Sequence, residues 1–378
     1  MKPYKIKIGI KTAGEPVIKK GEGFTLVENM LIGDGFHWQK TIRAKLPGEV
    51  SFNRIKEGNI KESKIREENV TIINTLPLED YLECVVGSEM NPAAPIEFLK
   101  AHAVISRSWA LGKILDIHPK GSNISKDDGG VLIGWDDTGT HKEFHVCSDD
   151  HCQRYQGLQP ISSVALSAIR ETMGEVLTTK EGEVLDARFS KCCGGKTELF
   201  ETCWQSDSKT GLVSVTDPWC DLSDLPDLSR RALLSTILKD YDLSTEGYGY
   251  SWEVTVPKGL IKRRLEECFN KNIGDIVKIE AVHRGISGRI DLLRVEGTSG
   301  KIEIGKELWV RRILSDSHLY SSAIEIKGKG ESFILKGKGW GHGVGLCQIG
   351  AAHMAARGYT YRQILSFYYP GALIHKIS

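Results

Sequence analysis

The clearest periodicity of apolar side chains begins after Pro77, where they recur at the three- and four-residue spacing of a helix until about Asn91. A second helical pattern opens at Pro95 and continues to about Leu115. Three further helices are predicted over residues 162–172, 348–356 and 360–369. Proline residues stand where the first two begin, as expected at a helix start.

Short alternating segments surround these helices. Residues 1–70 alternate apolar and polar positions with many Gly and Lys, which predicts short strands. Between residues 221 and 325, a helix pattern lies among strand patterns over 252–256, 277–282, 290–295 and 301–304. The whole predicts an α+β fold: a mixed helical core with β segments and an inserted smaller α+β domain. The predicted division is 1–70 for an N-terminal β-rich module, 71–220 for the first part of the core, 221–325 for the insert and 326–378 for the last part of the core.

Composition narrows the function mainly by exclusion. The chain has 378 residues, of which 40% are hydrophobic and 26% charged, and its net charge is +1. This balance creates no basic field for nucleic acid, and no apolar stretch has the length of a transmembrane helix. The N-terminus also lacks the apolar run of a secretory signal. Nine cysteines, an odd number, leave at least one thiol unpaired or metal-bound in a monomer.

Glu89 falls in the last turn of the first predicted helix, beside Val86 and Met90. The negative end of the helix dipole and the apolar neighbours both disfavour an ionised carboxylate, which suits a proton-donating acid. Lys100 and Arg107 are seven residues apart on the next helix, so they share a face that can present two cations to a cleft. Such a pattern is more often found among solvated surface residues, and a functional role needs further support.

His141, Cys147, His151 and Cys152 lie within twelve residues and form a Cys₂His₂ set suited to tetrahedral zinc, with His145 as a competing fourth ligand. Four protein ligands are typical of a structural site, so Zn²⁺ is expected to shape this loop. A disulfide between the two cysteines is the alternative. A zinc protease is not indicated, because Glu143 is misplaced relative to the His-Glu-x-x-His motif. The pattern of a zinc nucleobase deaminase is incomplete, because its Pro-Cys-x-x-Cys half is absent.

Glycine alternates with other residues over 337–345, and His342 and Gln348 stand in or beside this run. Missing side chains let a backbone approach a ligand or another backbone closely. The glycine spacing excludes a phosphate loop, whereas a tight structural turn remains an alternative. Gly194-Gly195, shortly after Ser190, is a candidate for a second wall of the same kind.

These stretches together resemble the stage II sporulation protein D / LytB family (SpoIID). The matching segments are Leu-Pro-Leu-Glu-Asp-Tyr-Leu at 76–82, Ser-Glu-Met at 88–90, Leu-Lys-Ala-His-Ala-Val at 99–104, Arg-Ser-Trp-Ala-Leu at 107–111, Gly-Trp-Gly-His-Gly-Val-Gly-Leu-Cys-Gln-Ile-Gly-Ala at 339–351 and Tyr-Tyr-Pro-Gly at 368–371. The resemblance covers about 72–375. The chain departs from the commoner pattern in Cys192-Cys193 before the glycine pair and in Cys347 before Gln348.

The resemblance implies a lytic transglycosylase. Such an enzyme cuts the β-1,4 bond between N-acetylmuramic acid and N-acetylglucosamine, prefers peptide-free strands and leaves 1,6-anhydro-muramic ends. Glu89, the Glu of Ser-Glu-Met, matches the family's catalytic residue. Some members bind zinc through a similar His/Cys loop. The candidate substrate contacts are Lys100, Arg107, Ser190, His342 and Gln348.

Two alternatives stay open. Members of the amidase-enhancer type raise the activity of a partner amidase, which makes a non-catalytic wall-binding activator the main rival. A zinc hydrolase acting on peptide or amide bonds of the wall would need an open position at the metal. All three roles predict a cell-envelope location, in the periplasm or on the outer face of the membrane. The expected partners are glycan strands and, for the enhancer, an amidase.

Overall fold

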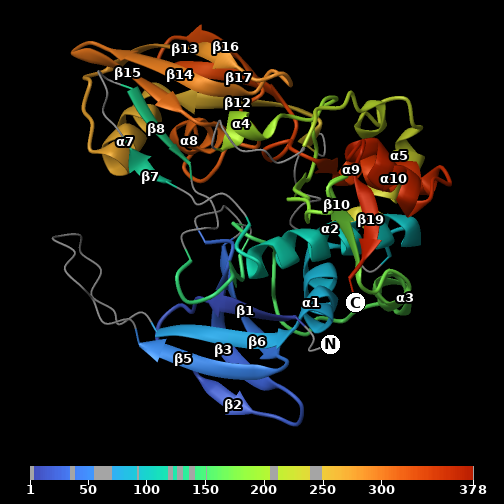
Figure 1. The fold of residues 1–378 in the computed structure, drawn as a ribbon. Helices are drawn as coiled ribbons and strands as arrows, with labels where there is room; N and C mark the ends of the chain where they lie inside the picture. The colour runs from blue at the N-terminus through green and yellow to red at the C-terminus, as the bar shows by residue number, and fades with distance from the viewer. Residues whose placement is uncertain are drawn as a thin grey trace.

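The structure, a computed structural model, describes residues 4–34, 39–54, 70–91, 93–117, 122–125, 131–135, 141–149, 151–204, 212–238 and 249–377. Helices and several small sheets form two bodies with separate hydrophobic cores (Figure 1), and the predicted α+β fold is confirmed. The lower body in Figure 1 holds both ends of the described chain. None of the described helices is both long and apolar enough to cross a membrane.

The N-terminal strands form two small sheets in the lower body. The first has the order β5-β6-β1-β9 and consists of β1 (Lys5–Ile10), β5 (Glu49–Arg54), β6 (Val70–Pro77) and β9 (Val146–Cys147). The second has the order β2-β3-β4 and consists of β2 (Ile18–Lys20), β3 (Thr25–Ile32) and β4 (Lys40–Leu46). Ile6 and Ile8 of β1 are fully buried, because alternate strand residues face the same side. They enter the same core as the helices of this body.

The long helix α2 (Ile96–Ile114) is the centre of the lower body. Its residues from Phe98 to Lys113 are buried with the single exception of Lys100, so it has no solvated face over this length. The helices packed on it are α1 (Leu78–Glu89), α3 (Ser163–Glu171), α9 (Gln348–Ala356) and α10 (Tyr361–Tyr368). A further helix, α5 (Asp227–Ile237), packs on α9.

Short strands complete this body. They form two pairs, of β10 (Glu175–Thr178) with β19 (Leu373–Lys376) and of β11 (Phe189–Ser190) with β18 (Leu346–Cys347). The second pair is parallel and brings the segment before Gly194-Gly195 beside the glycine-rich C-terminal run.

Among the described residues, the upper body contains two sheets, and the short helix α4 (Phe200–Cys203) packs on it (Figure 1). One sheet has the order β12-β17-β16, with β12 (Ser251–Pro257), β16 (Ile324–Lys329) and β17 (Ser332–Lys338). The other has the order β13-β14-β15-β8-β7, with β13 (Ile276–Arg284), β14 (Ile290–Gly297), β15 (Gly300–Gly305), β8 (Val131–Trp135) and β7 (Ser122–Ser125). Two further helices are α7 (Lys258–Phe269) and α8 (Glu307–Ile313).

Two strands of the upper body, β7 and β8, come from the segment predicted to be the first part of the core. β8 pairs in parallel with β15, and β7 pairs with β8 at the edge (Figure 1). Their shortness left no periodic signal in the sequence. Residue 325, the predicted end of the insert, lies inside β16, and β17 extends the same sheet to Lys338.

Arg107 is a fully buried cation of α2. Its guanidinium donates to both carboxylate oxygens of Glu79 at 2.8 Å and to the backbone carbonyl of Glu175 at 3.0 Å. Lys100 pairs with Glu97 at 2.8 Å and with the half-exposed Glu171 at 2.7 Å. Both cations predicted to face a cleft therefore belong to ion pairs within the lower body.

We expect Arg107→Ala to lower the free energy of unfolding by about 3 kcal/mol, because it leaves a partly buried carboxylate without its partner. The matched change Lys100→Ala breaks more exposed pairs and should cost about 1 kcal/mol or less. Urea unfolding followed by circular dichroism measures both. Equal losses for the two variants would contradict a structural role specific to Arg107.

Candidate active site and metal centre

A cleft of about 500 Å³ is lined by residues of both bodies. The carboxylates in its wall belong to Asp34, Glu89, Asp149 and Glu307. The aromatic side chains in its wall are Trp109, Phe189, Trp204, Tyr320 and Trp340. Aromatic rings with polar and charged groups among them are typical of a site for an amphipathic ligand such as a sugar chain.

Glu89 is the last residue of α1, and its side chain lies in the cleft wall although only 8% of the residue is exposed. Its Oε1 accepts a hydrogen bond from the backbone N–H of Arg154 at 2.8 Å. The neighbouring Ser88 hydroxyl accepts from the N–H of Gln156 at 3.0 Å and donates to the Cys84 carbonyl at 2.7 Å. The segment around residue 154 is therefore fastened to the end of α1 at two successive residues.

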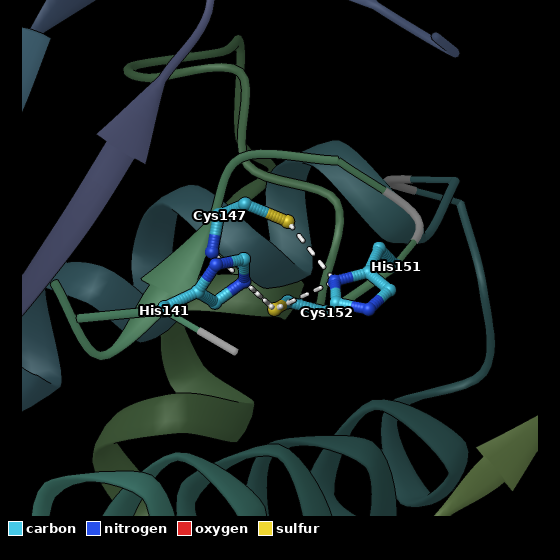
Figure 2. Close-up of side chains that lie close together, drawn as sticks. All are labelled: His141, Cys147, His151 and Cys152. Carbon is cyan, nitrogen blue, oxygen red and sulfur yellow. Dashed lines mark hydrogen bonds between the residues drawn. The ribbon is translucent and has the colours of Figure 1, made fainter. Parts of the chain in front are cut away.

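That segment directly follows the His/Cys loop. Figure 2 shows His141, Cys147, His151 and Cys152 pointing toward a common centre, with all four ligand atoms within 4.8 Å of one another. The Cys152 sulfur is 3.4 Å from His141 Nε2 and 3.8 Å from His151 Nδ1. A tetrahedral zinc ion separates its N and S ligands by about 3.3–3.8 Å. The four residues thus fit zinc, and with four protein ligands the ion would have no open position.

His145, the competing fourth ligand, lies outside this cluster. Its Nδ1 accepts the backbone N–H of Lys7 at 3.0 Å, so β1 holds this ring instead of the cluster. Cys147 and Cys152 are both free thiols in the structure.

The remaining predicted contacts divide into two groups. Ser190, His342 and Gln348 line the cleft, whereas Lys100 and Arg107 are not among its described lining residues. The Ser190 hydroxyl is buried and has no hydrogen-bond partner in the described structure, so it can serve a ligand. The geometry therefore favours the first group as contacts.

His342 and Gln348 are fixed in the wall by their neighbours. His342 Nδ1 accepts the N–H of Val344 at 3.0 Å, and its ring meets Trp204 edge-on. Burial, reinforced by nearby arginines, lowers the pKa of His342 well below its usual range, which makes the ring neutral. Gln348 Nε2 lies 3.2 Å from Nε2 of the buried His102, whose Nδ1 is 3.2 Å from the Ser106 hydroxyl.

The glycine-rich wall packs against Arg289, a residue that no sequence pattern marked. This fully buried guanidinium donates to the carbonyls of Gly341, at 3.1 and 3.2 Å, and Cys193, at 3.2 Å. A Cβ at Gly339 or Gly343 would stand 2.7 or 2.4 Å from its atoms, and both glycines have positive φ. Their small size is therefore required by packing against the cation.

The upper body adds charged groups that sequence reasoning also missed. Arg311 and Arg312 line the cleft, and Arg188 from the lower body lies 3.8 Å over the Trp204 ring. Glu307 Oε1 is buried without a hydrogen-bond partner among the described residues. No spacing pattern marks these residues, because helix α8 meets the lower body only in the folded chain.

A second set of potential ligands lies apart from the cleft. Cys193, Asp217, Cys220 and Cys347 are all buried, and their ligand atoms also lie within 4.8 Å of one another. This cluster can bind a metal as well.

Comparison with known proteins finds two matching family models and several distant relatives. A family model described as "Stage II sporulation protein" matches residues 66–179, and a model described as a domain of unknown function matches 198–345. Stage II sporulation protein D of Bacillus amyloliquefaciens is 26% identical over 338 residues, 86% of this chain and 84% of that protein. The protein of the same name from Bacillus subtilis is 25% identical, over 92% of this chain and 88% of its own length.

The amidase enhancer of Bacillus subtilis is 23% identical over 78% of this chain, but the match spans 40% of that protein. These matches define a cell-wall class of protein. The chain matches the SpoIID family model over residues 66–179 and is a distant homologue of stage II sporulation protein D and the amidase enhancer, so the resemblance on its motifs is confirmed.

We expect His141→Ala to lower the zinc content of the purified chain by about one equivalent, because it removes one of four ligands. His145→Ala is the matched control and should keep the zinc, since its ring binds the β1 backbone. Elemental analysis after dialysis measures both. Zinc lost from the His145 variant and kept by the other would reverse the ligand assignment.

His102 generates a prediction for acid stability. Burial lowers its pKa from 6.5 to about 3, so the unfolded chain binds a proton that the folded chain excludes. The stability that His102 contributes is present above pH 6.5 and is lost as the pH falls toward 3, by up to about 1.4 kcal/mol per pH unit. His102→Gln should flatten this dependence in urea unfolding between pH 6.5 and 4, whereas His283→Gln, at an exposed histidine, should not. An unchanged slope in the first variant would refute a neutral buried ring.

Proposed function

We propose that this protein is a peptidoglycan lytic transglycosylase with Glu89 as its catalytic acid and base. The observation that carries the proposal is the placement of the Glu89 carboxylate in the wall of an aromatic-lined cleft, held by the Arg154 N–H. Membership of the SpoIID family supports the substrate class, and the match of Ser-Glu-Met to the family's motif supports the residue.

The chemistry needs one carboxyl group used twice. Glu89, protonated, gives its proton to the glycosidic oxygen as the bond to C1 of N-acetylmuramic acid breaks. The carboxylate then removes the proton of the C6 hydroxyl, whose oxygen closes on C1 as the 1,6-anhydro ring. Glu89 ends protonated as it began, and no water is consumed. A second carboxylate, which hydrolytic glycosidases use, is not required.

Other groups of the cleft suit the binding of a glycan strand. Trp109 and Trp340 offer rings for the apolar faces of sugars, and the unpartnered Ser190 hydroxyl can bond a sugar hydroxyl. The lactyl carboxylate that remains on a peptide-free muramic residue would meet the arginines of α8. In this proposal, the arginines of α8 bind the substrate in place of Lys100 and Arg107, which were the cationic candidates from the sequence.

Zinc bound by His141, Cys147, His151 and Cys152 would have a structural role and would take no part in the bond cleavage. It would fix the loop whose continuation presents the Arg154 N–H to Glu89, two residues beyond Cys152. The proposed location is the cell envelope, where the glycan strands are found.

We expect Glu89→Gln to reduce the release of anhydro-muramoyl products from peptide-free glycan strands by about 100-fold or more, since the amide cannot donate or take the proton. Mass spectrometry of the products after timed incubation measures this. Glu307→Gln is the matched carboxylate control from the same cleft and should lose less than about tenfold.

Two outcomes would contradict the mechanism. Full formation of anhydro products by the Glu89 variant would remove Glu89 from the chemistry. Reducing ends without the anhydro ring, with equal loss in both variants, would indicate hydrolysis by two carboxylates.

A second function is favoured by the likeness to a protein named amidase enhancer. A wall-binding activator would raise the rate of an added amidase on intact peptidoglycan, and Glu89→Gln would leave this stimulation unchanged. Stimulation without any product from the unmodified chain alone would favour the activator over the enzyme.

A further inference from the structure

The buried cysteines of the lower body form a cluster that the cleft does not use. Cys193 Sγ lies 3.4 Å from Cys220 Sγ and 3.2 Å from an oxygen of Asp217, and Cys347 completes the set within 4.8 Å. All four residues are at most 2% exposed. They come from three segments far apart in the sequence: the turn after β11, the short helix η2 (Pro218–Cys220) and the residue before α9.

Backbone N–H groups are aimed at the sulfur atoms. Cys347 Sγ accepts from Cys193 N at 3.3 Å and from Gly350 N at 3.4 Å, and Cys220 Sγ accepts from Gly195 N at 3.1 Å. Cys347 is also the N-cap of α9, where the helix dipole favours negative charge. Three donors at two sulfurs stabilise thiolates, the form in which cysteine binds a metal.

The carboxylate is oriented from outside the cluster. One oxygen of Asp217 accepts from the buried Tyr368 hydroxyl at 2.9 Å, and the other accepts from the Trp219 N–H at 2.9 Å. Hydrogen bonds that fix a ligand in this way are typical of the outer shell of a metal site. If these groups lost their protons together, a cation among them would be needed to offset the cost of burying the charges.

We propose that Cys193, Asp217, Cys220 and Cys347 bind a second Zn²⁺ ion. Three sulfurs and one carboxylate oxygen form a four-coordinate set of the kind that zinc accepts, with neighbouring ligands about 3.5–3.8 Å apart. The observed separations of 3.2 and 3.4 Å are close to this spacing and far longer than the roughly 2.05 Å of a disulfide. Binding releases the thiol protons to solvent, with no change of oxidation state.

The position of the site suggests what the ion does. The turn at Cys193 continues from Ser190, and Cys347 immediately precedes Gln348, and both of these neighbours line the cleft. An ion between the two segments would hold two cleft walls at a fixed separation. This consequence for glycan cleavage rests on the proposed function, whereas the binding of zinc does not.

The test measures zinc in the full chain, purified with a reductant and dialysed. The unmodified protein should hold about two equivalents, and the double variant with His141→Ala and Cys152→Ser should keep about one. Cys220→Ser should lose about one, and Cys268→Ser, which removes a distant thiol, should lose none.

A second measurement does not depend on the folding of the cysteine variants. In the double variant with His141→Ala and Cys152→Ser, Co²⁺ substituted for zinc should give intense thiolate-to-metal charge-transfer absorption. Absence of this absorption, together with one zinc equivalent in the unmodified chain, would overturn the proposal. So would a Cys193–Cys220 disulfide found by alkylation and peptide mass analysis of the reductant-purified chain.

Cleavage assays separate this proposal from the preceding one. Cys220→Ser should raise the KM for peptide-free strands more than it lowers kcat. The change would loosen the cleft walls that contain Ser190 and Gln348 but leave the position of Glu89 unchanged. Two zinc equivalents without any glycan cleavage would leave the metal site standing and reject the transglycosylase.

Discussion

The arrangement of the cleft depends on the burial of one cation, Arg289, between the two bodies. Its guanidinium is fully buried. It donates hydrogen bonds to the backbone carbonyls of Gly341 and Cys193 and to the Ser287 hydroxyl at 2.9 Å. That hydroxyl in turn donates to Glu198 at 2.6 Å. A buried charge is tolerated only when its donors are satisfied, so this network fixes both carbonyl-bearing segments at once.

The consequence reaches both walls of the cleft. The segment with Gly341 contributes Trp340 and His342, and the segment with Cys193 contributes Ser190 and Lys191. Glu198 also accepts the N–H groups of Ile286 and Ser287, which ties the hairpin that carries the cation to the lower body. The upper body thus determines the position of the glycine-rich wall, because its Arg289 side chain packs against that segment.

Local patterns predicted the parts of this protein that depend on neighbours in sequence. The helices α1, α2, α9 and α10 lie within about two residues of their predicted bounds, and Glu89 ends α1 as predicted. The His141 and Cys152 loop was also visible, because its ligands are close in the chain. Helical spacing predicted that Lys100 and Arg107 share a face of α2. It could not predict that Glu171 of α3 and Glu79 of α1 form ion pairs with these two cations.

Contacts between distant segments left no such signal. Arg289 meets glycines about fifty residues later, and Cys193 meets Cys347 across 154 residues. The strands β7 and β8 join a sheet whose other members follow them by more than a hundred residues. In each case the sequence carries the right residue types, but only the fold decides which of them meet.

The His/Cys cluster and the Cys/Asp cluster share a structural setting beside the cleft. Cys147 lies in β9 and Cys347 in β18, strands of two residues each, and Cys193 closely follows the two-residue strand β11. Such strands have few ladder hydrogen bonds, while ordering a loop of about a dozen residues costs about 1–2 kcal/mol per residue. A bound structural zinc contributes about 10–16 kcal/mol, which is of the size needed to offset that cost. Where regular secondary structure is too short to hold a cleft wall, bound metal ions at the two proposed sites would fix it.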